Sequence, residues 1–187
     1  MALDLLVVDD EQDIRRLIAE ILRDEGYGCR EVGSGDAALA AVEQSVPDLI
    51  ILDIWLQGSS IDGVEVLERV ISTHADVPVI MISGHADIET AVNAIKIGAY
   101  DFIEKPFKAD RLLILVKRAL DAARLKRELA SLRQRVSADY ALIGTSPAIT
   151  RLRAAIDRVA PTESRVLIFG PAGAGKEVVA RMLHEHS

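Results

Sequence analysis

Short apolar runs alternate with amphipathic stretches along the first 120 residues of the chain. Most of the runs are rich in β-branched residues and apolar at successive positions, which is typical of strands buried on both faces within a parallel sheet. We therefore predict five strands, at Leu3–Val8, Gly28–Val32, Leu49–Leu52, Val79–Ile82 and Tyr100–Ile103.

Between these runs, apolar residues recur at the spacing of one helix face. Ser34 is expected to cap the second helix and Gly98 to close the fourth. The expected apolar stripes are Ile14, Leu17, Ile18, Ile21 and Leu22; Val64, Leu67 and Ile71; Ile88, Ala91, Val92 and Ile95; and Leu112, Leu115, Val116 and Ala119. Five strand–helix units with short connections predict an α/β fold, a five-stranded doubly wound parallel sheet, over residues 1–120.

The fifth helix is predicted to continue through a linker at residues 121–137, because no Gly or Pro interrupts its apolar pattern. One interpretation is an amphipathic helix that lies on its own domain; the other is a short coiled coil that joins two subunits. The apolar seam covers only about two heptads, fewer than a coiled coil usually shows. The seam consists of Ala122, Leu125, Leu129, Leu132 and Val136.

The pattern restarts in residues 138–187, which we interpret as the N-terminal fragment of a second α/β domain. Ser146 and Pro147 form a good helix start, with Ser as N-cap and Pro in the first turn. This helix should end near Val159, and Arg165–Phe169 is predicted to be a buried strand. A glycine-rich loop and a last amphipathic helix follow.

Composition and charge narrow the class of protein. The apolar runs are shorter than the roughly 20 residues that cross a bilayer, and no basic segment precedes the first one. Cys29 is the only cysteine, which excludes an internal disulfide and a cysteine-based zinc site, so we expect a reducing, cytoplasmic location. Residues 1–120 carry 22 acidic and 11 basic side chains, whereas the remainder carries 7 and 11, which favours two distinct segments.

Chemically informative residues follow the predicted strands. The carboxyl ends of parallel strands meet at one edge of a sheet, so Asp9, Asp10, Asp53, Ser83 and Lys105 should converge. Clustered carboxylates repel one another unless a cation lies among them, and oxygen ligands favour Mg²⁺. Each residue alone also has an ordinary structural role, as a helix cap, a turn residue or a solvated charge.

Four sequence blocks resemble the signature blocks of response regulator receiver domains, in the right order and over roughly residues 1–120. They are Val7–Glu11, Leu49–Asp53, Met81–Gly84 and Gly98–Phe107. The resemblance implies the strand order 2-1-3-4-5 of a flavodoxin-like sheet, and it assigns Asp53 as the acceptor of a phosphoryl group from a sensor histidine kinase.

The same resemblance assigns roles to the neighbouring residues. It implies that Asp10 and Asp53 bind Mg²⁺ directly, that Asp9 acts mainly through water, and that the backbone carbonyl of Trp55 is a further ligand. Ser83 would hydrogen-bond the phosphoryl group and Lys105 would pair with its charge. The resemblance also implies a cis peptide bond between Lys105 and Pro106, and it identifies Phe102 as the aromatic residue that turns inward upon phosphorylation.

The loop after Asp53 departs from the usual receiver pattern. Residues Ile54–Ile61 make it about two residues longer than usual, and Gln57 stands where a proline is common. The longer loop is similar to that of NtrX-type nitrogen-regulation response regulators. One hypothesis is that Trp55 and His85 screen the phosphoryl group from water.

A second motif lies near the end of the chain. Gly170, Gly173, Gly175 and Lys176 form a P-loop pattern between a predicted strand and a helix, the context in which backbone amides bind phosphates. Glu177 replaces the usual Ser or Thr. The segment resembles the start of the AAA+ domain in sigma-54-dependent activators, which also carry Gly-Lys-Glu.

These resemblances together predict a two-component response regulator of the NtrC/NtrX type. We expect this chain to be part of a longer regulator that binds ATP only at full length, and to be a Mg²⁺-dependent switch rather than an enzyme. Expected partners are a histidine kinase, a second copy of the chain and, through further regions, sigma-54 RNA polymerase and DNA, with no membrane. The alternative is a P-loop ATPase fragment joined to a phosphorylation-independent interaction module.

Overall fold

The computed structural model describes residues 3–84, 88–139, 142–162 and 164–187. The chain divides into two compact units, one up to Arg127 and the other from Glu128 onward. Each unit is described here by itself. In the described part of the chain, no helix is both long enough and apolar enough to span a membrane.

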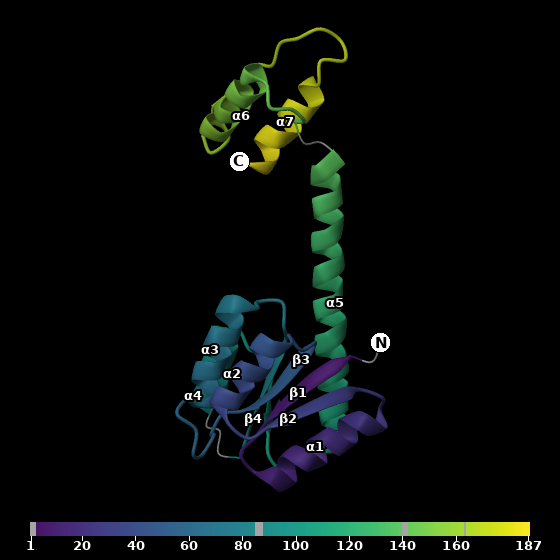
Figure 1. The fold of residues 1–187 in the computed structure, drawn as a ribbon, viewed down its shortest axis with the longest axis vertical. Helices are drawn as coiled ribbons and strands as arrows, with labels where there is room; N and C mark the ends of the chain where they lie inside the picture. Colours follow the sequence, from purple (N-terminus) through teal and green to yellow (C-terminus); the bar gives the residue numbers. More distant parts are fainter. Residues whose placement is uncertain (1–2, 85–87, 140–141, 163) are drawn as a thin grey trace. The chain divides into compact units, whose positions relative to one another are not determined.

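The first unit contains a five-stranded parallel sheet in the order β2-β1-β3-β4-β5 (Figure 1). This confirms the predicted fold class and strand order. The strands begin and end within one residue of the expected positions: β1 (Asp4–Val8), β2 (Gly28–Val32), β3 (Leu49–Asp53), β4 (Val79–Ser83) and β5 (Asp101–Glu104).

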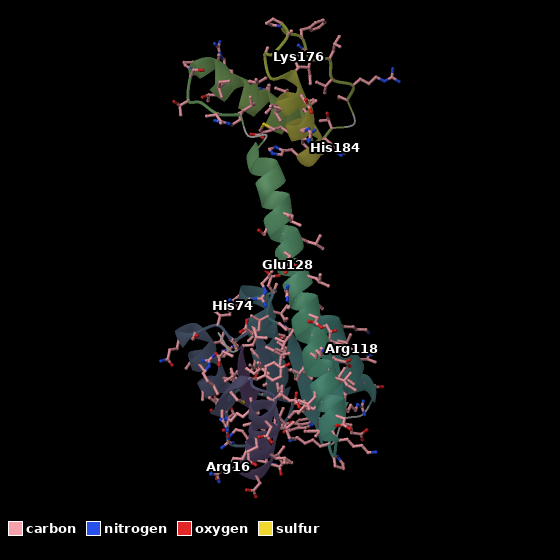
Figure 2. All side chains as sticks on the ribbon, turned by 90° about the vertical axis from the view of Figure 1, so that its right-hand side faces the viewer. Arg16, His74, Arg118, Glu128, Lys176 and His184 are labelled. Carbon is pink, nitrogen blue, oxygen red and sulfur yellow. The ribbon has the colours of Figure 1, made fainter. Side chains whose placement is uncertain are left out.

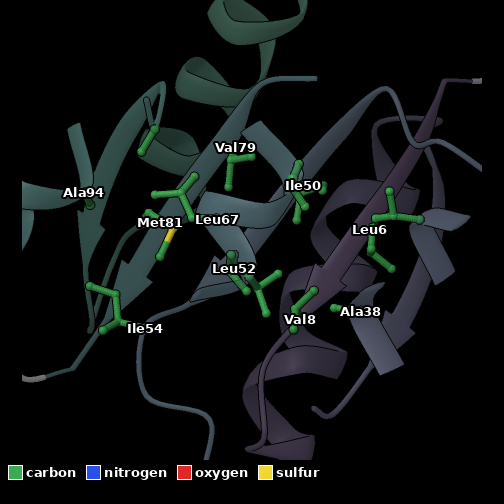
Figure 3. Packing of buried hydrophobic residues seen from close by; sticks show 14 of the residues in the cluster. Leu6, Val8, Ala38, Ile50, Leu52, Ile54, Leu67, Val79, Met81 and Ala94 are labelled. Carbon is green, nitrogen blue, oxygen red and sulfur yellow. The ribbon is translucent and has the colours of Figure 1, made fainter. Parts of the chain in front are cut away.

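Helices cover both faces of this sheet, and alternate residues of each strand belong to different cores (Figure 1). On one face, α2, α3 and α4 pack over strand residues such as Leu6, Leu52 and Met81, as Figure 3 shows. On the other face, α1 and α5 cover residues such as Val7 and Ile51. The helices are α1 (Gln12–Asp24), α2 (Gly35–Gln44), α3 (Gly63–Thr73), α4 (Ile88–Ile97) and α5 (Ala109–Asp139).

Local sequence signals set the helix ends. The Ser34 hydroxyl accepts a hydrogen bond from the backbone N–H of Ala37 at 3.3 Å, which confirms the predicted cap of α2. Asp62 and Glu65 form a reciprocal capping box at the start of α3. Gly98 has φ +130° after the last residue of α4, a conformation that favours glycine and ends the helix as predicted.

Two of the predicted apolar stripes are wider than the buried helix face. In α4, Val92 and Ile95 are exposed, and Ala94 fills the contact with the core instead (Figure 3). In α1, Leu17 is exposed while Ile18 and Leu22 are buried. The stripe predictions are wrong at Val92, Ile95 and Leu17 because each helix carries more apolar residues than the sheet has room to cover.

Helix α5 is continuous through Asp139, so the absence of a stop after residue 120 is confirmed. Arg118 and Glu128, labelled in Figure 2, both lie on it. Along its later turns, the three leucines of the predicted seam are exposed rather than packed on the sheet: Leu125 by 59%, Leu129 by 56% and Leu132 by 56%.

The second unit contains α6 (Pro147–Val159) and α7 (Lys176–Glu185). The Ser146 hydroxyl accepts a hydrogen bond from Ile149 N–H at 3.4 Å, which confirms the predicted start of α6. The predicted strand at Arg165–Phe169 does not form. A strand needs a neighbour to satisfy its backbone groups, and the described residues of this unit supply none, so Leu167 and Phe169 stay exposed.

Candidate functional site

The carboxyl ends of β1, β3, β4 and β5 bring Asp9, Asp10, Asp53, Ser83 and Lys105 to the same edge of the sheet. Asp9, Asp10 and Asp53 each place a carboxylate oxygen within 4.8 Å of the other two. The convergence that the sequence predicts therefore exists, because these four neighbouring parallel strands end side by side.

Lys105 supplies the positive charge at the centre of this acidic group. Its Nζ lies 2.6 Å from Asp53 Oδ2, 2.8 Å from Asp9 Oδ2 and 3.5 Å from Glu11 Oε1. Its backbone N–H donates to the carbonyl of Ser83 at 2.8 Å, which fixes the start of the side chain beside β4. The Lys105–Pro106 peptide bond is cis, as the resemblance implied.

Asp9 is buried in the floor of the site. Its Oδ1 accepts a hydrogen bond from Glu11 N–H at 2.9 Å, and the Arg15 guanidinium donates to its backbone carbonyl at 2.6 Å. Its Oδ2 is also buried and pairs with Lys105, but it has no well-aligned hydrogen bond among the described residues. Such an oxygen is suited to an additional cationic partner.

The electrostatics of the site reflect burial opposed by Lys105. Burial raises the pKa of Asp9 and of Asp53 above the ordinary value of 3.8, although the Lys105 ammonium group beside both carboxylates acts in the opposite direction. For Lys105 itself, burial lowers the pKa, but its contacts with the Asp53 and Asp9 carboxylates outweigh burial and leave the pKa raised. The ammonium group is therefore held in its charged form.

The donor set fits a hard divalent cation. Three carboxylates face a single ammonium group, so negative charge exceeds positive charge inside a partly buried site. Their ligand atoms are all oxygens, which Mg²⁺ prefers. Asp9, Asp10 and Asp53 could hold the ion, and the cluster leaves a solvent-facing side where water can complete its shell.

Asp53 lies at the end of β3 with only 4% of its surface exposed. Trp55 N–H donates to Asp53 Oδ1 at 3.3 Å, so the chain after the strand turns back over the carboxylate. Gly63 lies directly against Asp53: a Cβ on Gly63 would be 1.9 Å from the Asp53 carbonyl oxygen. Sequence reasoning missed this role of Gly63, although the Asp62-Gly63 pair after the loop was its signal.

A pocket of about 780 Å³ opens above these groups. Glu11 and Gln57, which the sequence did not single out as site residues, belong to its lining. Trp55, more than half exposed, also borders the opening. The full lining is Asp10, Glu11, Ile14, Asp53, Trp55, Gln57, Gly84, Lys105 and Pro106.

Two further residues with predicted roles lie close to this edge. Ser83 is buried at the end of β4, next to the backbone of Lys105. Phe102 in β5 is half-buried, pairs in register with Met81 and packs against the core under α4. His85 lies outside the described residues.

The glycine-rich loop of the second unit forms a compact turn before α7. Gly173 and Gly175 have φ values of +79° and +80°, which side-chain-bearing residues rarely adopt. Lys176 Nζ donates to the carbonyls of Gly170 and Pro171 at 2.9 and 2.7 Å, so the loop folds around its own lysine. Glu177 pairs with Arg181 one turn further along α7, at 2.9 Å.

Two sequence families match the chain. Residues 5–117 match the response regulator receiver domain, and residues 142–187 match the sigma-54 interaction domain. The chain is 56% identical over 187 residues to the nitrogen assimilation regulatory protein NtrX of Azorhizobium caulinodans, covering 100% of this chain and 41% of that protein. It is 38% identical over 186 residues to the C4-dicarboxylate transport transcriptional regulatory protein DctD of Rhizobium meliloti, covering 98% and 40%.

Solved structures agree with these matches. NtrX from Brucella abortus in complex with ATP aligns with a TM-score of 0.70 and 56% identity, over 100% of this chain and 41% of that chain. The receiver domain of the same protein aligns with a TM-score of 0.62 and 58% identity, over 63% of this chain and 98% of that chain. The chain spans about two fifths of the length of the curated relatives described above. Since the receiver-domain match covers more than half of it, the chain belongs to the response regulator receiver family, as a two-component response regulator of the NtrC/NtrX type.

Proposed function

We propose that the chain is a phosphorylation switch in which Asp53 accepts a phosphoryl group from a sensor histidine kinase. The observation that carries the proposal is the position of Asp53, whose carboxylate is almost buried yet lines the open pocket between Lys105 and the Asp9–Asp10 pair. This environment admits a phosphoryl donor from one side while charged groups fix the carboxylate from the others.

In the proposed transfer, a carboxylate oxygen of Asp53 attacks the phosphorus of a phosphohistidine. A new O–P bond forms, the P–N bond breaks, and the histidine nitrogen keeps the bonding electron pair and takes up a proton. Lys105 is placed to pair with the phosphoryl oxygens, because its ammonium group already lies 2.6 Å from Asp53. Asp10, Asp53 and the Trp55 carbonyl, with Asp9 mainly through water, would hold Mg²⁺, which would supply further positive charge to the site.

The response to phosphorylation is proposed to pass from β4 to β5. Ser83 would hydrogen-bond the phosphoryl group, and the half-buried Phe102 would turn further inward. Phe102 is suited to this because it lies two residues before Glu104, the register partner of Ser83. The change would then reach the exposed face formed by α4, β5 and α5.

We further propose that α5 joins two copies of the chain in a short coiled coil. Leu125, Leu129 and Leu132 recur at coiled-coil spacing and stay exposed on a helix that continues to Asp139. Residues 1–120 would then act as the receiver, residues 121–137 as the linker, and residues 138–187 as the start of an AAA+ domain.

The role of the whole protein is proposed from its relatives. A full-length, cytoplasmic regulator would use ATP, sigma-54 RNA polymerase and DNA, and phosphorylation of Asp53 would control that activity. Gly170, Gly173, Gly175, Lys176 and Glu177 are the proposed nucleotide-binding residues, since an NtrX structure was solved with ATP and the loop here has the P-loop form.

The test of the central proposal is the intact mass of the chain after incubation with acetyl phosphate and Mg²⁺. Wild type should gain one phosphoryl group, and neither an Asp53→Asn variant nor an EDTA-treated sample should gain it. If neither a small donor nor a partner kinase modifies wild type, and beryllofluoride leaves Trp55 fluorescence unchanged, the phosphorylation-independent interaction module replaces this proposal.

A further inference from the structure

The longer loop between β3 and α3 has apolar anchors only at its two ends. Leu56 and Ile61 are buried in the core under α2 and α3. The arc between them, residues 57–60, carries polar or no side chains and lies mostly at the surface. Gln57 in this arc borders the mouth of the acidic pocket, so what holds the arc also shapes the pocket.

The arc is held by the first turn of α2. The Ser60 hydroxyl donates its one hydrogen to the Asp36 carboxylate, 2.7 Å from Oδ1 and 2.8 Å from Oδ2, and the Ser60 backbone N–H donates to Asp36 Oδ2 at 3.2 Å. Ser59 also approaches Asp36, at 3.5 Å, and its hydroxyl accepts from the backbone N–H of Gly35 at 2.9 Å. We call Asp36, Ser59 and Ser60 the loop clamp.

The start of α2 and the end of the loop are in direct contact beside the loop clamp. A Cβ on Gly35 would lie 2.6 Å from Ile61 Cγ1 and 2.9 Å from the Ile61 carbonyl oxygen, so α2 packs directly on the loop. Gly58 has φ +73°, and Ser59 N–H donates to the Leu56 carbonyl at 3.4 Å, which closes a tight turn with Gln57 at its tip. Fixing Ser59 and Ser60 therefore fixes Gln57.

We propose that Asp36 is a positioning residue for the acceptor pocket, acting through Ser59 and Ser60 to hold Trp55 and Gln57 over Asp53. The proposal rests on the function proposed above. It gives the longer loop a point of attachment, since the hydroxyl groups of Ser59 and Ser60 fasten the loop to α2. Hydrogen bonds from Ser60 lower the pKa of Asp36, in agreement with a carboxylate that stays ionised and bound.

The clamp acts on the pocket through the metal ligands. Trp55 N–H contacts Asp53 Oδ1, and the Trp55 carbonyl is a proposed Mg²⁺ ligand one residue before the buried Leu56. When the loop clamp is lost, residues 57–60, which follow Trp55 and Leu56, are no longer held against α2. The pocket then loses pre-organisation, so Mg²⁺ binding must first order the loop and becomes weaker.

The experiment measures Mg²⁺ affinity by Trp55 fluorescence, because Trp55 is the single tryptophan of the chain. Asp36→Ala should raise the Kd for Mg²⁺ about fivefold, the scale of losing one ordinary hydrogen bond. Asp36→Asn removes the charge but keeps an oxygen acceptor for Ser60, so it should stay within about twofold of wild type. Amide hydrogen exchange in residues 54–62 should accelerate in Asp36→Ala, with or without Mg²⁺.

Asp110→Ala is the matched control, because Asp110 occupies the same place in the first turn of α5 as Asp36 does in α2. The Kd of Asp110→Ala for Mg²⁺ should match that of wild type. An unchanged Kd in Asp36→Ala overturns the proposal, and so does an equal rise in Asp36→Asn or in Asp110→Ala, since charge alone would then explain the effect. If wild type binds Mg²⁺ but gains no phosphoryl group, the proposed function is contradicted instead. The Kd values of the variants for Mg²⁺ still test whether Asp36 positions the loop.

Discussion

Gly63 approaches the backbone of Asp53 so closely that a methyl group on Gly63 would lie 1.9 Å from the Asp53 carbonyl oxygen. Gly63 N–H also donates to the Ile54 carbonyl at 2.9 Å, so the first turn of α3 rests on the end of β3. The backbone at the end of β3, which carries Asp53, is therefore packed against α3 by a contact that only glycine allows.

We predict that Gly63→Ala lowers the free energy of unfolding by about 2–3 kcal/mol, because β3 and α3 must separate to admit the methyl group. Urea denaturation followed by circular dichroism measures this loss. Gly84→Ala is the control, since no atom of the described residues, apart from its chain neighbours, lies within 4 Å of a Cβ at that position. Equal stability of the two variants would contradict the close contact.

Lys105 is the cation that makes the buried carboxylates tolerable. Lys105→Met should lower the free energy of unfolding by about 3 kcal/mol without Mg²⁺, since Asp9 and Asp53 remain buried without their partner. Urea unfolding in EDTA checks this value. Adding Asp53→Asn to Lys105→Met should recover part of the loss, and a double variant with strictly additive losses would show that the two groups do not interact.

The pH dependence of the acidic site should be opposite to that of a salt-bridged surface aspartate. Because the pKa values of Asp9 and Asp53 are raised, their carboxyl groups ionise in the unfolded chain near pH 3.8 but only at higher pH in the folded chain. Their contribution to stability therefore falls as pH rises from 3.8 through the folded pKa values.

Mg²⁺ affinity should rise over the same pH interval, since protons compete with the ion for Asp9 and Asp53. Titrations followed by Trp55 fluorescence, from about pH 4 to about pH 7, measure this competition. In Asp53→Asn the pH dependence should become shallower. A wild-type Kd that is constant above pH 4 would contradict raised pKa values at these residues.

How far the sequence predicted this site depended on whether a residue's place follows from the sheet. Asp10, Asp53 and Lys105 were found because hydrophobic runs locate strand ends and the parallel topology brings those ends together. Asp36 and Ser60 were not found from the sequence, since they are 24 residues apart and their hydrogen bonds follow no periodic pattern.

The wrong predictions have a related cause. Apolar character predicted a strand at Arg165–Phe169, but a strand forms only beside another strand, and the described part of the second unit has none. In α4, the stripe prediction chose Val92 and Ile95 over Ala94, because hydrophobicity measures preference for burial and not the space available. Both errors concern which residues pack next to each other in space, and a single sequence does not specify this.

Cys29 should be an unreactive thiol in the folded chain. Burial raises its pKa to about 11 from an ordinary value of 9.0, so at pH 8 its thiolate fraction falls about 100-fold below that of an unfolded chain. Alkylation by iodoacetamide should be slower by about that factor than in urea. Above pH 9 the unfolded state ionises first, so the free energy of unfolding should decrease with pH there, and a Cys29→Ala variant should lack that component.

The exposed leucines of the α5 seam, Leu125, Leu129 and Leu132, give the last prediction. Leu129 is 56% exposed, so Leu129→Glu should leave the free energy of unfolding of the first unit within about 0.5 kcal/mol of wild type. It should nevertheless weaken self-association at least tenfold, because a charge at the centre of a two-heptad seam must be desolvated in the coiled coil. Sedimentation equilibrium measures the dimer dissociation constants of wild type and of Leu129→Glu.

Leu17→Glu is the matched control for this prediction, since Leu17 is 54% exposed but lies on α1, away from the seam. It should dimerise as wild type does. Equal weakening by both substitutions would assign the effect to net charge, and a Leu129→Glu chain that still dimerises normally would place the subunit contact on another face. If only Leu129→Glu loses the dimer, the seam is the contact between subunits. Net charge cannot explain that result, because both variants add the same charge at leucines of similar exposure.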